Sequence, residues 1–365
     1  MGEIVMKYEI SITKTACPKE KPADESKLGF GKVFTDHMFI MDYSADKGWH
    51  DGRIVPFGPL SIHPASTVLH YGAEIFEGMK AYRRADGTIG LFRPMENVRR
   101  LNRSAERLCL PELDEEGCLD ILNTLVELEK DWVPHSEGTS LYLRPYLFGN
   151  DPHLGVHAVK NATFVVICSP VGAYYAEGIN PVKIAIESTD VRAVRGGTGY
   201  AKCGGNYAAS LRAGQRAEEK GYTQVLWLDG VEQKYIEEVG AMNVMFKISG
   251  KIVTPSLASG SILPGITRKS CLELLKDWGF EVEERKISVD ELFAAAADGS
   301  LEEAWGTGTA AVVSPIGQLF YQGNSYTLCG GEIGPVAQKL YDQLTGIQWG
   351  KVEDKFGWTQ FVCNG

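Results

Sequence analysis

The sequence predicts a mixed α/β fold arranged in two domains. The chain has 365 residues, enough for two domains of ordinary size. Segments with the period of a helix alternate with short apolar segments of strand length. A stretch around 170–181 has Gly and Pro at both ends and no periodicity, as an interdomain linker should. We therefore expect an N-terminal arm over 1–28, one α/β domain over 29–171, a linker over 172–181 and a second α/β domain over 182–365.

Composition excludes several classes of protein. Lys and Arg number 37 against 47 Asp and Glu, a formal charge of −10, so a basic nucleic-acid-binding surface is not expected. No run of 18 apolar residues occurs, so we expect no membrane partner. The start lacks the apolar region of a signal peptide. The eight cysteines are scattered without a CxxC pair, which predicts reduced thiols, no zinc site and a cytoplasmic protein.

Apolar spacing predicts the elements of the first domain. The residues up to Phe30 are polar and irregular and are expected to form a mobile arm leading into a strand over 33–41. Pro94 precedes apolar residues at helical spacing, which predicts a helix over about 95–108. A second helix is expected over about 114–131.

Residues 139–148 alternate in character and predict a strand. Leu141 and Leu143 would face one way, and Tyr142 and Arg144 the other. This strand therefore carries one polar face.

The second domain begins with a strand and a segment dense in glycine. We expect strands at 182–187, 223–228, 234–237 and 243–248 and helices at about 207–220 and 266–277. A further helix opens at Ser288, with Glu291 three residues on, the pattern of a capping box.

Lys202 is the first candidate for chemistry. It lies in segment 195–206, which contains five glycines. A random loop lysine is usually solvated, but such a loop lets a planar group lie against backbone, and a desolvated amine could form a Schiff base. The G-x-G-x-x-G pattern of NAD-binding proteins fails, because Lys202 stands where the third glycine belongs.

Two further segments could bind anions. Pro264 and Gly265 open a helix whose first N–H groups, with the Thr267 hydroxyl, suit a phosphate. Residues 306–311 form a turn of small residues with exposed N–H groups. Either feature alone would more often be an ordinary helix start or turn.

Taken together, short motifs along the chain share their order and spacing with one enzyme family. They are Phe30-Gly31-Lys32, His63-Pro64-Ala65-Ser66, Phe76-Glu77-Gly78-Met79-Lys80, Leu91-Phe92-Arg93-Pro94, Arg107 to Pro111, Leu154-Gly155-Val156, Lys202 with 204–207, Glu238-Val239-Gly240, Leu263 to Arg268 and Gly308-Thr309-Ala310. Over about 28–350 the chain resembles the branched-chain amino acid aminotransferases, which are fold-type IV pyridoxal-phosphate (PLP) enzymes.

The resemblance implies a smaller domain over 29–171, a larger PLP-binding domain over 182–365, an active site between them, and a homodimer. By the same resemblance Lys202 is the Schiff-base lysine and the proton carrier, and Tyr207 bonds the ring hydroxylate. Glu238 is the partner of the ring nitrogen. Adjacent Glu237 competes for that role, but on a strand the two would face opposite ways. The phosphate would be held by Arg100, Ile266, Thr267 and Thr309.

The substrate pocket implied by the resemblance is aromatic with one cation. Its members would be Phe30, Tyr71, Phe76, Tyr142, Tyr174 and Arg144, with Val156 reaching in from the other subunit. The N–H groups of Thr309 and Ala310 would bind the substrate α-carboxylate. Each aromatic residue alone would more often be plain core.

The resemblance implies ping-pong transamination of leucine, isoleucine and valine with 2-oxoglutarate, giving branched-chain 2-oxo acids and glutamate. A D-amino acid aminotransferase or aminodeoxychorismate lyase of the same fold remains an alternative, as does a non-catalytic PLP-binding protein. An NAD-dependent dehydrogenase is a weaker alternative. The chain departs from mammalian members in one respect: Ala311 and Ser314 stand where those carry a CxxC redox pair. We therefore expect thiol regulation of that type to be absent.

Overall fold

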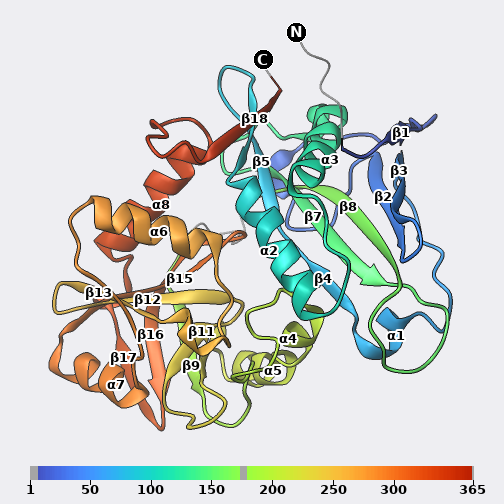
Figure 1. Ribbon diagram of the computed structural model, residues 1–365. Helices are drawn as coiled ribbons and strands as arrows, with labels where there is room; N and C mark the ends of the chain where they lie inside the picture. The colour runs from blue at the N-terminus through green and yellow to red at the C-terminus, as the bar shows by residue number, and fades with distance from the viewer. Residues whose placement is uncertain (1–6, 173–178, 364–365) are drawn as a thin grey trace. The chain divides into compact units, whose positions relative to one another are not determined.

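The computed structural model describes residues 7–172 and 179–363, and the chain forms two compact units (Figure 1). Of the described residues, the first unit contains those up to 172 together with 201–204 and 347–363, and the second contains the rest. Both units combine helices with a large sheet, so the mixed α/β class is confirmed. The two observed units differ from the domains expected from the sequence at two places, because residues 201–204 and 347–363 belong to the first unit.

The sheet of the first unit runs in the order β1-β3-β2-β8-β7-β5-β6-β18, with β4 also paired to β7. All its pairings are antiparallel except the parallel pair β1 and β3. Its last strand comes from the end of the chain, which explains why 347–363 return to this unit. The strands are β1 (Ile10–Ile12), β2 (His37–Ser44), β3 (Gly48–Pro56), β4 (Glu74–Phe76), β5 (Met79–Arg83), β6 (Ile89–Phe92), β7 (Ser140–Gly149), β8 (Asn161–Val171) and β18 (Thr359–Cys363).

Helices α2 (Pro94–Arg107) and α3 (Glu115–Leu128) contact each other and share the core of this sheet (Figure 1). Pro94 occupies the first turn of α2, as predicted, because its missing N–H would have no partner there. Leu101 and Leu122 are among the buried side chains that join helix to sheet. The remaining helical elements of this unit are α1 (Thr67–Tyr71), η1 (Glu25–Lys27) and η2 (Lys130–Trp132).

The N-terminal segment is more ordered than the sequence suggested. Residues 10–12 form an edge strand in which Ile10 lies opposite Gly52. A Cβ at Gly52 would approach the carbonyl oxygen of Glu9 to 2.6 Å, so glycine is required for this pairing. The Thr15 N–H also donates to His37 Nε2 at 2.9 Å. The expectation of an irregular segment is therefore wrong for 10–12; the strand has only three residues, too few for its Ile-Ser-Ile alternation to predict a strand.

The sheet of the second unit runs β11-β10-β9-β16-β15-β12-β13-β14, with β17 on β16. A further pairing of β11 with β12 closes six of these strands into a ring. The strands are β9 (Val182–Glu187), β10 (Gln224–Leu228), β11 (Ile236–Val239), β12 (Met242–Ile248), β13 (Lys251–Pro255), β14 (Val282–Arg285), β15 (Leu301–Gly308), β16 (Val312–Tyr321) and β17 (Asn324–Thr327). The helical elements are α4 (Gly204–Ala208), α5 (Leu211–Glu219), α6 (Ile266–Asp277), α7 (Val289–Asp298), α8 (Pro335–Gln348), η3 (Leu257–Ser259) and η4 (Cys329–Gly331).

Two expected elements of this unit are displaced. The helix expected at 207–220 is split into α4 and α5, and near the break the Ser210 hydroxyl donates to the Tyr207 carbonyl at 2.7 Å, competing with helical bonding. The strand expected at 234–237 lies at 236–239, because the Asp229 carboxylate accepts bonds from the backbone N–H of residues 231, 232, 234 and 235 and holds them in a loop. Across the described ranges, no helix has the length and apolar character needed to cross a membrane.

The helix start predicted at Ser288 gives a test of local stability. Ser288 Oγ accepts from the Glu291 N–H at 3.0 Å, which confirms the cap, while the Glu291 carboxylate pairs with Arg285 at 2.6 Å. Ser288→Ala should lower the free energy of unfolding by about 1 kcal/mol, measured by urea denaturation. Ser288→Asp, whose side chain can still cap the helix, should lower the free energy of unfolding much less. Equal losses in the two variants would contradict the capping role.

Candidate active site

The backbone around Lys202 is fixed by the first unit. The Phe76 N–H donates to the Lys202 carbonyl at 2.9 Å, and Ile75 forms an antiparallel bridge with Cys203. The Lys202 N–H donates to Ser104 Oγ at 2.9 Å, which ties the segment to α2. Cys203 thus makes a single β-bridge to β4, with the bonds of Lys202 on one side of it.

Gly204 lies close to Glu74 at this attachment. Its N–H donates to Glu74 Oε1 at 2.5 Å, and a Cβ at this position would lie 2.0 Å from the same oxygen. A side chain there would have to displace the Glu74 carboxylate and break this bond. At least one glycine that singled out this segment in the sequence therefore serves close approach to another part of the chain.

The Lys202 amine lies in a desolvated, charged environment. Its Nζ is 4.7 Å from the centre of the Phe76 ring. Burial, and then the nearby Arg100 guanidinium, lower the pKa of Lys202 from 10.5 to about 8, while Glu77 acts in the opposite direction. With a pKa of about 8, roughly a tenth of the amine is neutral at pH 7. Such an amine is available as a nucleophile or base.

The wall beside the amine is aromatic and carries a cation. The Arg144 guanidinium carbon lies 4.7 Å from the Phe76 ring centre, and Arg144 Nη2 donates to the Tyr142 hydroxyl at 2.8 Å. Phe30 meets the Tyr142 ring edge-on at 4.9 Å between centres. The alternation predicted for β7 is confirmed, because Leu141 and its neighbour two residues on lie in the core, on the face opposite Tyr142 and Arg144.

Gly78 makes room for this wall. A Cβ at Gly78 would lie 2.0 Å from the Tyr142 hydroxyl oxygen. The sequence places Gly78 in a motif but does not explain why a residue without a side chain is needed there. The structure supplies the reason, since the hydroxyl that binds Arg144 occupies that space.

Three predicted pocket residues lie apart from these contacts or outside the described residues. The Tyr71 side chain is 42% exposed, and its hydroxyl accepts from the Gly155 N–H at 2.8 Å. Val156, one residue further on, is 86% exposed. Tyr174 falls outside the described residues.

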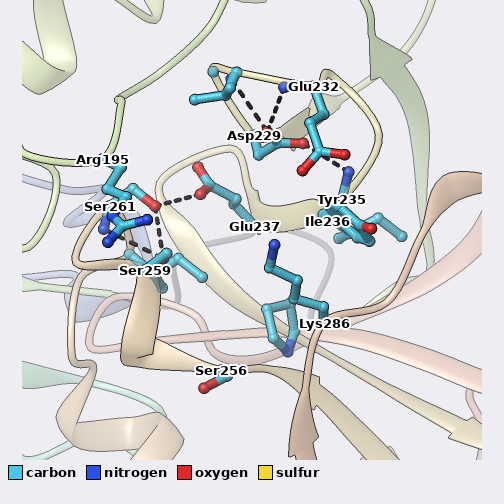
Figure 2. A pocket seen from close by; sticks show the side chains of 14 residues that line it. Arg195, Asp229, Glu232, Tyr235, Ile236, Glu237, Ser256, Ser259, Ser261 and Lys286 are labelled. Atoms are coloured by element: carbon cyan, nitrogen blue, oxygen red, sulfur yellow. Dashed lines mark hydrogen bonds between the residues drawn. The ribbon is translucent and has the colours of Figure 1, made fainter.

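In the second unit, Glu237 and Glu238 line different cavities, as alternation along β11 requires. Glu238 shares a small cavity with Tyr207 and Arg192. Glu237 accepts a hydrogen bond from the Ser261 hydroxyl and faces a separate cavity of about 160 Å³ (Figure 2). Burial raises the pKa of Glu237 above its ordinary value, against the effect of the Ser261 bond.

Two residues that sequence reasoning missed hold Glu238. Arg192 Nε lies 2.5 Å from Glu238 Oε2, and both side chains are buried. Asn243 Nδ2 donates to Glu238 Oε1 at 3.0 Å and to the Leu263 carbonyl at 2.9 Å. Asn243 lies three residues after the Glu238-Val239-Gly240 motif and could have been found from it. Arg192 lies outside every motif quoted, and only the fold reveals it.

The bond from Asn243 also reaches the start of α6. Gly265 is the N-cap residue, and a Cβ there would lie 2.0 Å from Asn243 Oδ1. Ile266 and Thr267 form the buried first turn. The carboxylate of Glu238 and the N-terminus of α6 are thereby held in one arrangement.

The second predicted anion turn connects β15 to β16. Thr309 and Ala310 lie in it and are half-buried. The turn ends at Val312, whose φ is 61°, a conformation that β-branched residues rarely adopt. Such strain costs on the order of 1–3 kcal/mol and is typical of functional turns.

A lysine with a depressed pKa is suited to covalent chemistry with a carbonyl group. The family model described as amino-transferase class IV matches residues 74–319, a span that includes this lysine and the strands that hold it. The chain belongs to that family.

Within the family, the similarity is to branched-chain enzymes, which confirms the resemblance found in the sequence. The chain is 59% identical to branched-chain-amino-acid aminotransferase 2 of Bacillus subtilis (strain 168), over 98% of each chain. The solved structure of the Escherichia coli branched-chain amino acid aminotransferase has a TM-score of 0.74 at 27% identity, covering 90% of this chain and 99% of that chain. A solved branched-chain amino acid aminotransferase from T.th., complexed with N-(5'-phosphopyridoxyl)-L-glutamate, has a TM-score of 0.73 at 27% identity, covering 89% of this chain and 98% of that chain.

The depressed pKa of Lys202 can be tested directly. Brief acetylation of the cofactor-free protein at different pH, read by peptide mass spectrometry, should reach half its limiting rate at Lys202 near pH 8. Lys251 is the internal control, because its bonds to Glu281 and Glu283 raise its pKa above 10.5. It should react only at higher pH. A Lys202 midpoint above pH 10 would contradict a desolvated amine.

Proposed function

We propose that this protein transfers the amino group of leucine, isoleucine or valine to 2-oxoglutarate, with PLP as cofactor, giving the branched-chain 2-oxo acid and glutamate. The observation that carries the proposal is the desolvated Lys202 amine, fixed through its backbone and set beside an aromatic wall with one arginine. Membership of the amino-transferase class IV family supports it. The branched-chain enzyme of Bacillus subtilis, 59% identical, supports the substrate class.

The residues present fit PLP. Arg100, Ile266, Thr267 and Thr309 supply a guanidinium, a helix start and a hydroxyl suited to a phosphate. Tyr207 would bond the ring hydroxylate. Glu238, a buried carboxylate held by Asn243 and Arg192, supplies the acid that would pair with the ring nitrogen.

In this reaction the chain's own lysine moves the proton. When bound, PLP supplies an electron sink for the charge left when the substrate Cα loses its proton. Lys202 Nζ in its neutral form takes that proton and returns it on the other side of the transfer. Its lowered pKa keeps part of the amine neutral near pH 7, and its fixed backbone keeps Nζ within reach. The second half-reaction, with 2-oxoglutarate, reverses these steps, which makes the kinetics ping-pong.

One pocket must accept both an apolar side chain and a carboxylate. Phe30, Phe76 and Tyr142 provide apolar surface for leucine, isoleucine or valine. Arg144, whose guanidinium stacks beside Phe76, would pair with the side-chain carboxylate of 2-oxoglutarate. The phosphopyridoxyl-glutamate in the T.th. complex supports an acidic second substrate. Tyr174 completes the proposed wall, and the N–H groups of Thr309 and Ala310 would bind the α-carboxylate.

A homodimer is part of the proposal. Leu69, Tyr71, Leu154 and Val156 are all exposed apolar or aromatic residues, and the bond from Gly155 to Tyr71 joins the two segments that carry them. An exposed group of this kind is typical of a surface that binds a partner. We expect Val156 to enter the active site of the partner subunit.

We also propose the cytoplasm as the compartment. The cysteines whose side chains the structure describes, at 17, 109, 118, 168, 203, 271 and 329, carry free thiols. A set of free thiols favours a reducing compartment.

The proposed function is tested by replacing the amine. Lys202→Ala should abolish conversion of leucine and 2-oxoglutarate, measured as glutamate formed, together with the visible absorption of lysine-bound cofactor. Circular dichroism should show a folded protein. Lys251→Ala, which removes an exposed lysine, is the matched control and should keep full activity. Retention of both turnover and absorption in the Lys202 variant would overturn the mechanism.

The role of Arg144 predicts a change in specificity. Arg144→Gln should raise the KM for 2-oxoglutarate about 10- to 100-fold, the worth of a hydrogen bond to a charged group, and should change the KM for leucine much less. Arg53→Gln removes an arginine paired with Asp42 elsewhere in the same sheet and should change neither. Equal rises for leucine and 2-oxoglutarate would show that Arg144 does not select the acidic substrate.

A further inference from the structure

Glu77 is a fully buried carboxylate to which the proposed mechanism gives no task. It lies between β4 and β5, with 0% of its surface exposed. Its Oε1 accepts from Arg100 Nε at 2.6 Å, and its Oε2 accepts from Arg100 Nη2 at 2.9 Å. Asn97 Nδ2 donates to Oε2 at 2.8 Å, and the Gly78 N–H donates to it at 3.2 Å. The Glu77 carboxylate therefore makes a two-point hydrogen bond to one edge of the Arg100 guanidinium.

The pairing is unlike that of the neighbouring arginine. Arg99 pairs with Glu115 at 3.1 Å on the exposed face of α2, where solvent screens the charges and the pair contributes little. Arg100 is 3% exposed, and a two-point bond fixes the orientation of its planar group. Packing alone does not require a buried guanidinium, because apolar residues can fill such a site at least as well. The fixed geometry of Arg100 therefore indicates a role beyond packing.

The same residues connect Glu77 to the lysine. Phe76, one residue before Glu77, donates its N–H to the Lys202 carbonyl at 2.9 Å, and the Glu77 N–H donates to the Pro145 carbonyl at 2.7 Å. Arg100 lowers the pKa of Lys202, and Glu77 raises it. The two charges of the ion pair thus act on the Lys202 amine in opposite directions.

We propose that Glu77 is a positioning residue that orients Arg100 toward the cofactor phosphate and offsets the guanidinium charge beside Lys202. The proposal rests on the proposed function, since it needs PLP as the cofactor. It assigns to Glu77 a part in cofactor binding that acts through Arg100 and does not touch the reacting atoms.

The first variant is Glu77→Gln. Both oxygens of Glu77 accept from N–H donors, so an amide NH₂ in either position would face a donor and break the two-point bond. The Kd of the cofactor-free protein for PLP, followed by absorbance, should rise about 10-fold or more, the worth of one charged hydrogen bond. The Kd for pyridoxal, which has no phosphate, should change much less. Glu115→Gln, which removes the exposed partner of Arg99, should alter neither.

The charge effect has a separate readout. In Glu77→Gln the acetylation midpoint of Lys202 should move to lower pH, because a negative charge has been lost, and in Arg100→Gln it should move to higher pH. Glu77→Asp keeps the charge but shortens the side chain. It should therefore keep the wild-type midpoint and still bind PLP more weakly. If Glu77→Gln fails to fold, the Asp and Arg100 variants carry the same test.

The outcomes separate the two proposals. Wild-type protein that does not bind PLP would sink the proposed function. Wild-type protein that binds PLP, with Glu77→Gln binding it equally well or losing affinity for pyridoxal to the same extent, would overturn the role of Glu77 alone. A further loss of PLP affinity when Glu77→Gln is added to Arg100→Gln would also overturn it, because Glu77 would then act by another route.

Discussion

The attachment of residues 201–204 to β4 is the constraint on which the site depends. Two backbone contacts and one side-chain bond place a loop that is distant in sequence at the edge of a sheet. The backbone of Lys202 is therefore fixed. The hydrogen bonds of residues 201–204 order it, and the Lys202 side chain does not have to contribute. A flexible lysine would incur that ordering cost at each turnover. Gly204 leaves room for the Glu74 carboxylate at this attachment.

Around this fixed backbone, the chemistry of the amine is set by a balance of charges. Desolvation and Arg100 favour the neutral amine, and Glu77 limits their effect. Arg144 adds a cation at the aromatic wall, where its guanidinium is held by the Tyr142 hydroxyl. A site with these cations and no acid would disfavour the protonated amine more strongly, and one without the cations would leave desolvation alone to lower the pKa of Lys202. The proposed function thus gives the buried ion pair a role in the chemistry of the site as well as in its packing.

The second unit uses the same principle with different residues. Asn243 joins the Glu238 carboxylate to the Leu263 carbonyl and packs against Gly265, so a single amide fixes both an acid and a helix start. Arg192 offsets the cost of burying that acid. At the first residue of β16, Val312 adopts an unfavourable backbone conformation. Strain of this kind persists only where the surrounding strands over-determine the backbone.

Much of the secondary structure could be predicted from the sequence, because hydrophobic periodicity and residues that end helices and strands act locally. The helix over 266–277, the strand over 182–187 and the two faces of β7 needed only local pattern, and the family followed from motif order. The three-residue strand β1 and the ion pairs that hold Arg100 and Glu238 were decided by the tertiary structure. Each of these contacts joins residues that are separated along the chain. The two ion pairs, for example, join Glu77 to Arg100 and Arg192 to Glu238. Their strength comes from shared burial, a property that no single segment possesses before the chain has folded.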